Sequence, residues 1–139
     1  MRFTGFDGRE YPINVSDYLV YGNDTRARSG LHLEARKLLK QLFPADTILE
    51  EVTLPGSKKS GSCLYADFLL PLQKVMVEVQ GEQHYVFTPY FHRSKEAFTE
   101  AKKRDRDKKE WCEINGLILV ELPFNKKDEW RNRIVNRWD

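Results

Sequence analysis

The sequence of 139 residues has little of what marks a secreted, zinc-binding or membrane protein. It contains only two cysteines, Cys63 and Cys112, which are too few and too far apart for a zinc motif or a disulfide framework. No apolar run approaches the roughly 20 residues of a membrane span, and the opening residues MRFTGFDGRE lack the core of a signal peptide. These absences predict a reduced, cytoplasmic protein with no membrane partner.

A strong charge of one sign is also missing. The formal net charge is only +2, so the total does not indicate a nucleic-acid partner. The basic residues gather in short clusters, which usually form solvated faces: Lys58–Lys59, Lys102–Arg104, Lys108–Lys109 and Arg131–Arg133. With 40% hydrophobic residues, the chain is expected to bury a core of its own.

The spacing of apolar residues predicts an α/β fold with a central mixed β-sheet of four to five strands flanked by helices. Helices are expected over residues 29–43, 94–115 and 126–138, and strands over residues 47–54 and 116–124, with two more strands between residues 64 and 85. Residues 30–139 are expected to form the core domain, and residues 1–29 an N-terminal arm or small hairpin. Trp130, Ile134 and Trp138 share one face of the last predicted helix and are expected in the core.

The two strands between residues 64 and 85 carry acidic residues where strands rarely have them. If Leu72 and Gln73 form the turn after Pro71, Asp67 lies opposite Glu78 on one side of the sheet. Directly paired side chains have Cβ atoms roughly 5 Å apart, so the two carboxylates would repel each other without a cation between them. A divalent metal ion answers this repulsion. Two solvated carboxylates on an exposed face are the alternative interpretation.

The order of these residues resembles that of a nuclease superfamily. Glu34 in the first helix, Asp67 in one strand and Glu78-Val79-Gln80 in the next look like the PD-(D/E)XK nucleases. The segment EVQGEQHY, residues 78–85, is similar to the E-x-x-G-x-x-H signature of the very-short-patch-repair-like branch.

Two later segments strengthen the resemblance, which covers roughly residues 30–124. Asp105 and Lys108 in the second predicted helix resemble an acidic and basic pair of that branch. Residues 111–124, WCEINGLILVELPF, are similar to phage and large-virus nucleases of this type, some of them homing endonucleases.

The resemblance implies a restriction-endonuclease-like core and a Mg²⁺-dependent endonuclease for double-stranded DNA, acting site-specifically in the homing or restriction manner. Mn²⁺ is expected to substitute for Mg²⁺, and the protein to be phage-encoded and to act inside the host cell. Asp67, Glu78 and the Val79 carbonyl would hold the ion, and Glu34 a second ion or its waters. The implied supporting residues are Gln80 to orient the attacking water, His84 as general base or phosphate contact, and Asp105, Lys108 and Gln83 around them.

Gln80 departs from the usual lysine of the family, because a neutral amide can hold a water or phosphate only by hydrogen bonds. This departure motivates one alternative, an inactive DNA-binding module with the nuclease fold. A structure-specific nuclease for branched or mismatched DNA, which would use the same residues, is a second alternative, and an RNA-directed nuclease is a third. The usual proline before the catalytic Asp67 is replaced by Ala66.

Four basic residues are candidates for contacts with the DNA backbone. Lys58 and Lys59 lie in the Gly-rich loop PGSKKSGS, and Arg26 and Arg28 precede the first helix. An ordinary polar loop and a plain linker are the alternatives for these two segments. A homodimer is expected, since a short chain offers little surface for base readout. The remaining histidines, His32 and His92, are expected at the surface.

Overall fold

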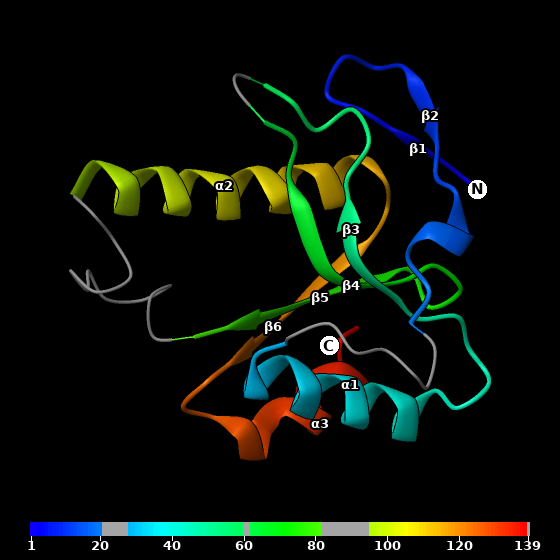
Figure 1. Ribbon diagram of the computed structural model, residues 1–139, viewed down its shortest axis with the longest axis vertical. Coiled ribbons are helices and arrows are strands. Elements are labelled where there is room, and N and C mark those ends of the chain that lie inside the picture. The colour runs from blue at the N-terminus through cyan, green and yellow to red at the C-terminus, as the bar shows by residue number, and fades with distance from the viewer. Residues whose placement is uncertain (21–27, 60–61, 82–94, 139) are drawn as a thin grey trace.

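The structure is a computed structural model that describes residues 1–20, 28–59, 62–81 and 95–138. It contains a four-stranded mixed sheet with helices on both faces and a separate two-stranded sheet near the N-terminus (Figure 1). The predicted α/β fold with a central mixed sheet is therefore confirmed. None of the helices in the described part of the chain is long and apolar enough to cross a bilayer.

The elements follow the predicted order along the chain. The N-terminal sheet has the strands β1 (Arg2–Thr4) and β2 (Glu10–Pro12), and the helices are α1 (Gly30–Leu42), α2 (Lys95–Ile114) and α3 (Trp130–Val135). The strands of the large sheet are β3 (Leu49–Thr53), β4 (Tyr65–Leu70), β5 (Val75–Gln80) and β6 (Ile118–Pro123). Short 3₁₀ turns occupy Val15–Asp17 and Lys127–Glu129.

The large sheet has the strand order β3-β4-β5-β6, in which β3, β4 and β5 are antiparallel and β6 is parallel to β5. A four-residue turn, Pro71–Lys74, joins β4 to β5, and Leu70 pairs with Val75 directly beside it. The next two pairs continue the register predicted from a turn centred on Leu72 and Gln73. The predicted hairpin register is thus confirmed next to the turn.

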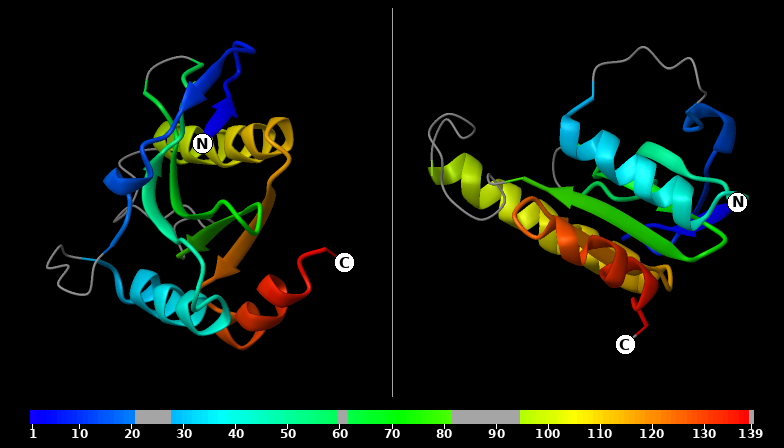
Figure 2. Two further views of the ribbon diagram at one scale, coloured as in Figure 1. Left: turned by 90° about the vertical axis from the view of Figure 1, so that its right-hand side faces the viewer. Right: turned by 90° about the horizontal axis from the view of Figure 1, so that it is seen from below.

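Each face of the sheet is covered by its own hydrophobic cluster, with α2 on one side and α1 and α3 on the other (Figures 1 and 2). The cluster under α2 includes Leu69, Met76 and Trp111, and the cluster under α1 and α3 includes Ala35, Leu39, Phe68, Val77 and Ile134. Because both faces are covered, β5 reads as a nearly continuous apolar run.

The N-terminal hairpin packs on the α2 side rather than standing apart. Phe3 of β1 lies against Trp111 of α2, with the two ring centroids 5.3 Å apart. Asn115 at the end of α2 bonds to both polar groups of the Thr4 backbone: its Oδ1 accepts from the Thr4 N–H, and its Nδ2 donates to the Thr4 carbonyl. The predicted small hairpin is therefore present and is part of the packed structure.

One expected core residue is exposed. Trp130 is buried, with its indole N–H donating to the Pro123 carbonyl at 2.8 Å, whereas Trp138 is 67% exposed. The prediction for Trp138 was wrong because α3 ends at Val135, so the helical periodicity that would turn its side chain inward stops three residues earlier.

The two cysteines are free thiols in different surroundings, which gives a direct test of the core. Cys112 of α2 is 1% exposed, and burial, with the negative charge of Glu78 nearby, raises the pKa of its thiol to about 12. Since the thiolate is the reactive form, iodoacetamide is expected to label the half-buried Cys63 and to spare Cys112 until the protein unfolds. Mass spectrometry of the labelled peptides measures this, and equal labelling rates at both positions under native conditions would contradict the packing of α2.

Candidate active site

The pairing of β4 with its two neighbouring strands is interrupted at Asp67, and the site is built there. In β3, Glu51 has a φ of 50°, a left-handed conformation that is uncommon for a residue with a side chain. The alternation of side chains breaks at this point: Val52 packs in the cluster under α2, while Glu50 faces α1. In the described strands the ladder pairs skip Asp67, which lies opposite Glu51 in β4.

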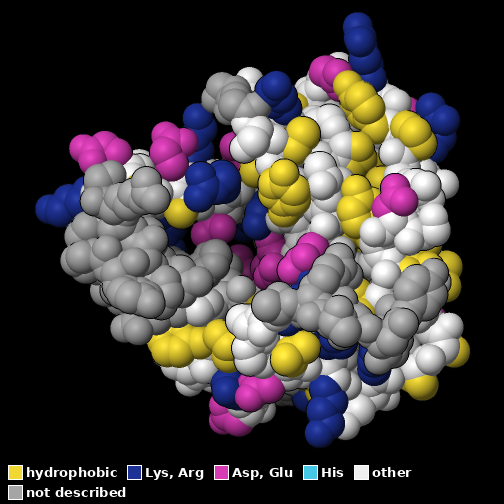
Figure 3. All heavy atoms as spheres, viewed as in Figure 1, with side chains coloured by type: hydrophobic (Ala, Val, Ile, Leu, Met, Phe, Trp, Pro, Cys, Tyr) yellow, Lys and Arg dark blue, Asp and Glu magenta, His cyan; other side chains and the backbone are white. Residues whose placement is uncertain are grey.

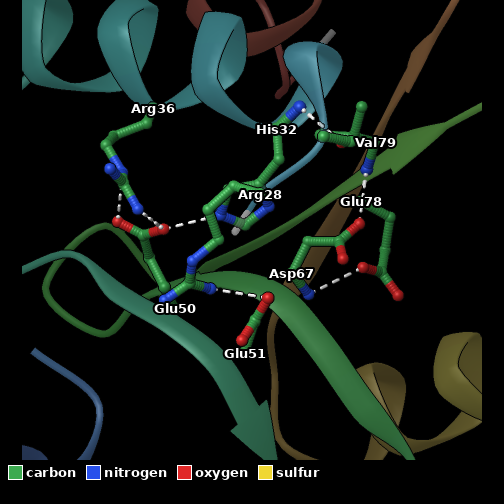
Figure 4. Close-up of polar contacts among 9 residues, drawn as sticks. Arg28, His32, Arg36, Glu50, Glu51, Asp67, Glu78 and Val79 are labelled. Carbon is green, nitrogen blue, oxygen red and sulfur yellow. Dashed lines mark hydrogen bonds and ion pairs between the residues drawn. The ribbon is translucent and has the colours of Figure 1, made fainter. Parts of the chain in front are cut away.

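Side chains replace the backbone ladder between Asp67 and Glu78. The Asp67 N–H donates to Glu78 Oε2 at 2.9 Å, and the Val79 N–H donates to Asp67 Oδ2 at 2.8 Å (Figure 4). Each carboxylate therefore binds the backbone of the neighbouring strand, and this exchange holds the two acidic groups side by side. The predicted juxtaposition of Asp67 and Glu78 is present, although the two residues are not a backbone ladder pair.

A cavity of about 410 Å³ opens over these carboxylates, between α1 and α2. Its lining combines the end of β5 with the first residues of α1 and the middle of α2: Ser29, Leu31, His32, Asp67, Glu78, Val79, Gln80, Gly81, Asp105 and Lys108. In the space-filling view the same face is hollowed, and acidic side chains lie in the hollow (Figure 3). The cavity is wide enough for a phosphate group with its waters.

The electrostatics around Glu78 are set by the carboxylate of Asp67 and the ammonium group of Lys108. Glu78 is 6% exposed, and this burial together with the Asp67 carboxylate raises the pKa of Glu78 to about 8. Lys108 of α2 opposes that shift, since its Nζ lies 2.5 Å from Glu78 Oε1. Burial disfavours the charged ammonium, but Glu78 and Asp67 outweigh it and hold the pKa of Lys108 above its ordinary value. The site thus has acidic groups crowded enough to attract a further cation.

Several residues predicted for the site meet at this cavity. Gln80 is 5% exposed and lines it two residues after Glu78. Lys108 was expected only in the surroundings of the site, but its ammonium group contacts the Glu78 carboxylate directly. Asp105, one turn earlier in α2, lines the same cavity.

Other predicted site residues lie elsewhere. Glu34 is exposed on α1 and forms an ion pair with Lys127 at 2.9 Å, so the structure does not bring it to the cavity. Its prediction as a metal ligand has no geometric support.

The candidate DNA-binding residues differ in what they contact. Lys59 binds Asp107 and Glu110 of α2, and Arg28 binds Glu51 at 2.5 Å with a side chain that is almost fully buried. Lys58 is exposed. The other predicted residues in these segments, Arg26, Gln83, His84 and His92, lie outside the described residues.

Sequence reasoning missed His32, which was expected at the surface and is 6% exposed. The Ser29 side chain accepts from the His32 N–H at 3.1 Å and caps α1, which places His32 in the first turn beside the cavity. The signal was present in the spacing of His32, Ala35 and Leu39, which share the buried face of α1.

A buried carboxylate anchors this histidine. Glu50 Oε1 lies 2.6 Å from His32 Nε2, and the Arg36 guanidinium donates to both oxygens of Glu50 at 2.9 and 3.0 Å (Figure 4). Burial alone would raise the pKa of Glu50, but the hydrogen bonds from His32 and the charge of Arg36 lower it. Glu50 is therefore a carboxylate held from two sides.

Replacing Glu50 by glutamine is expected to lower the free energy of unfolding by about 3 kcal/mol at neutral pH, because Arg36 loses its buried counter-charge. The pKa of Glu50 is lower in the folded than in the unfolded chain, so its contribution is complete above about pH 4.5, the ordinary carboxyl value, and is lost as the pH falls through the folded pKa. Urea titrations of both proteins across that range measure the difference.

The control for this prediction is Glu121→Gln, at an exposed carboxylate of β6, which is expected to change stability by no more than about 0.5 kcal/mol. A difference between wild type and Glu50→Gln that stayed constant from pH 7 to pH 3 would contradict the prediction.

The donor set of the cavity suits a hard divalent ion. Asp67, Glu78 and the Val79 carbonyl offer only oxygen ligands, and Mg²⁺ is commonly held by one or two carboxylates with waters and substrate phosphates completing its shell. Among the residues that the structure describes, no three His, Cys, Asp or Glu side chains converge on one point. This arrangement fits an ion shared with a substrate better than a closed structural metal site.

Comparisons with known proteins give viral relatives. The chain is 42% identical over 73 residues to uncharacterized protein 307L of Invertebrate iridescent virus 6, covering 52% of this chain and 37% of the relative. It is 32% identical over 106 residues to uncharacterized protein 033L of Invertebrate iridescent virus 3, covering 76% of this chain and 54% of the relative. It is 31% identical over 70 residues to uncharacterized protein 094L of Frog virus 3, covering 50% of this chain and 45% of the relative.

The chain therefore spans about half or less of the length of these relatives. No family model matches the chain, and no solved structure matches it. The relatives belong to viruses named for invertebrates and a frog, so they give no support to a phage origin.

Proposed function

We propose that the chain is a divalent-metal-dependent endonuclease of the PD-(D/E)XK type that hydrolyses phosphodiester bonds in double-stranded DNA. The observation that carries this proposal is the pair of carboxylates of Asp67 and Glu78, which line an open cavity. Each of them accepts a hydrogen bond from a backbone N–H of the other strand. The order of helix, acidic strand and E-x-Q strand supports it, because each element reaches the same cavity.

Asp67, Glu78 and the Val79 carbonyl would hold Mg²⁺, or Mn²⁺ in its place. Such an ion supplies Lewis acidity to a scissile phosphate and lowers the pKa of a coordinated water. Burial and the Asp67 carboxylate raise the pKa of Glu78 even with Lys108 against it, so a second negative charge is disfavoured there. A divalent cation would offset the repulsion between the two carboxylates, and also the repulsion between them and a bound phosphate.

The chain's own residues supply the remaining contacts. The Gln80 amide lines the cavity, where it can hold the attacking water by a hydrogen bond. Lys108 reaches the same cavity from α2 with a charged ammonium group. We infer that Lys108 provides, from a helix, the positive charge that Gln80 cannot provide from the strand, and that it binds an oxygen of the scissile phosphate.

DNA binding by this chain would draw on exposed basic residues of α2 and of the loop after β3. Lys103 and Arg104 lie on the exposed side of α2, and Lys58 is exposed in the loop after β3. We propose site-specific cutting of the homing or restriction kind inside an infected cell, by a homodimer that presents two such surfaces to the duplex.

The experiment that tests the function is cleavage of a complex duplex DNA library by the purified protein with Mg²⁺, followed by sequencing of the new ends. Recurrent ends that disappear with EDTA are the expected result, and their alignment gives the target and the overhang. A four-way junction and a mismatched duplex, tested in parallel, distinguish a structure-specific nuclease. Retained DNA binding without any Mg²⁺- or Mn²⁺-dependent ends would reject the proposal in favour of an inactive binding module.

A further inference from the structure

A second group of residues meets the cavity from α1 and is not used by the metal-binding carboxylates. His32 lines the cavity and is nearly enclosed, with its ring stacked on Phe68 at 4.4 Å between centroids and 20° between planes. Phe68 follows Asp67 in β4, and His32, Asp67 and Glu78 all line the same cavity. Packing and the Ser29 cap together fix the position of the ring.

Glu50 also fixes which ring nitrogen carries the proton. A carboxylate can only accept a hydrogen bond, so Nε2 of a neutral His32 must donate to Glu50 Oε1 across their 2.6 Å contact. Arg36 binds both oxygens of Glu50 and keeps that carboxylate charged and in place. The lone pair of the neutral imidazole therefore resides on Nδ1.

His32 lines the cavity, and its second ring nitrogen, Nδ1, is not the one that contacts Glu50. Glu50 is absent from the lining of the cavity while His32 belongs to it, so Nε2 turns away from the opening. Within the part of the chain that the structure describes, Nδ1 takes part in no hydrogen bond. His32 thus combines an anchored Nε2 with an unbonded Nδ1, in a residue that lines the same cavity as Asp67, Glu78 and Lys108.

We propose that His32 accepts, through Nδ1, the proton of the water that attacks the scissile phosphate, with Glu50 and Arg36 as positioning residues. This inference rests on the proposed nuclease function and names its proton acceptor. As the water oxygen bonds to phosphorus, its O–H bond breaks and the proton passes to Nδ1. The bond from phosphorus to the leaving sugar oxygen breaks with its electron pair, and that oxygen takes a proton from solvent.

The Glu50 carboxylate stabilises the imidazolium that forms, since it lies on the opposite nitrogen with its own charge held by Arg36. Loss of the proton to solvent then returns His32 to its starting tautomer. The arrangement is a carboxylate–histidine pair whose orientation is set before any substrate arrives.

Two substitutions at His32 separate a catalytic from a structural role. In His32→Gln the amide reaches the place of Nε2 and can keep the bond to Glu50, but nothing replaces Nδ1. A general base contributes about a hundredfold or more, so His32→Gln is expected to lower kcat by at least about a hundredfold. The KM for DNA, the affinity for Mn²⁺ and the melting temperature are expected to stay close to wild type.

In His32→Gly, added imidazole is expected to restore cleavage in proportion to its concentration, whereas Asp67→Asn gains nothing from imidazole. Cleavage by folded His32→Gln within threefold of wild type would overturn the role of His32 and leave the nuclease function standing. Absence of Mg²⁺-dependent cleavage by wild type would overturn both.

Discussion

Replacing Asp67 by asparagine is expected to lower kcat for the proposed Mg²⁺-dependent cleavage of duplex DNA by at least about a hundredfold. Asparagine keeps an oxygen that can accept from the Val79 N–H, so the bridge between β4 and β5 survives. The negative charge that would hold the cation is lost, and without it the pKa of Glu78 moves back toward its ordinary value. Cleavage of a defined target by wild type and variant, at equal concentrations, measures the effect.

The matched control is Asp128→Asn, which makes the same chemical change at an exposed carboxylate of the 3₁₀ turn before α3. It is expected to cut at the wild-type rate. Wild-type rates from a folded Asp67→Asn variant would remove Asp67 from the site.

The second large effect concerns the position of the positive charge. Lys108→Met is expected to lower kcat by about a hundredfold or more, because the cavity loses its only lysine among the residues that line it. The variant is expected to remain folded, since Glu78 without its counter-charge can take up a proton instead of staying as a buried anion. Binding of Mn²⁺ is expected to persist, because the variant loses a cation that repels the metal ion, while Glu78 must release its proton to the solvent when the ion binds.

Adding Gln80→Lys to Lys108→Met is expected to restore a large part of the activity. Position 80 lines the same cavity and lies two residues after Glu78 in β5, so a lysine there returns the charge from the strand. Lys109→Met, at an exposed neighbour in α2, is the control and is expected to cut normally. If the double variant stayed as inactive as Lys108→Met, Lys108 would act by holding Glu78 and not by its charge on the substrate.

The pattern of residues was sufficient to predict the hairpin because its register depends on local chemistry. Pro71 and the apolar strands on either side of it place Leu70 opposite Val75, and the same register brings Asp67 next to Glu78. Helix α1 followed in the same way from the spacing of its apolar residues, whereas α3 covers only Trp130–Val135 of the predicted residues 126–138. Both faces of β5 are covered, which the apolar run of that strand had indicated.

The rest depended on contacts between distant parts of the chain. Glu34 pairs with Lys127, 93 positions away. The sequence around Glu34 does not distinguish a residue that forms this ion pair from one that reaches the cavity. The left-handed backbone of Glu51 is equally hidden, because the local sequence does not demand a positive φ there. His32 could have been placed by helical spacing, but its partner Glu50 comes from a strand whose side chains change face at the next residue.

The central claim is that Asp67 and Glu78 together bind a divalent cation, and titration of Mn²⁺ tests it most directly. The electron paramagnetic resonance signal of free Mn²⁺ falls as the ion binds, so binding can be measured with no DNA present. Wild type is expected to bind Mn²⁺ and the double variant Asp67→Asn/Glu78→Gln to lose that binding, while both proteins melt at similar temperatures. Equal binding by the two proteins, or none by wild type even with duplex DNA added, would contradict the metal site.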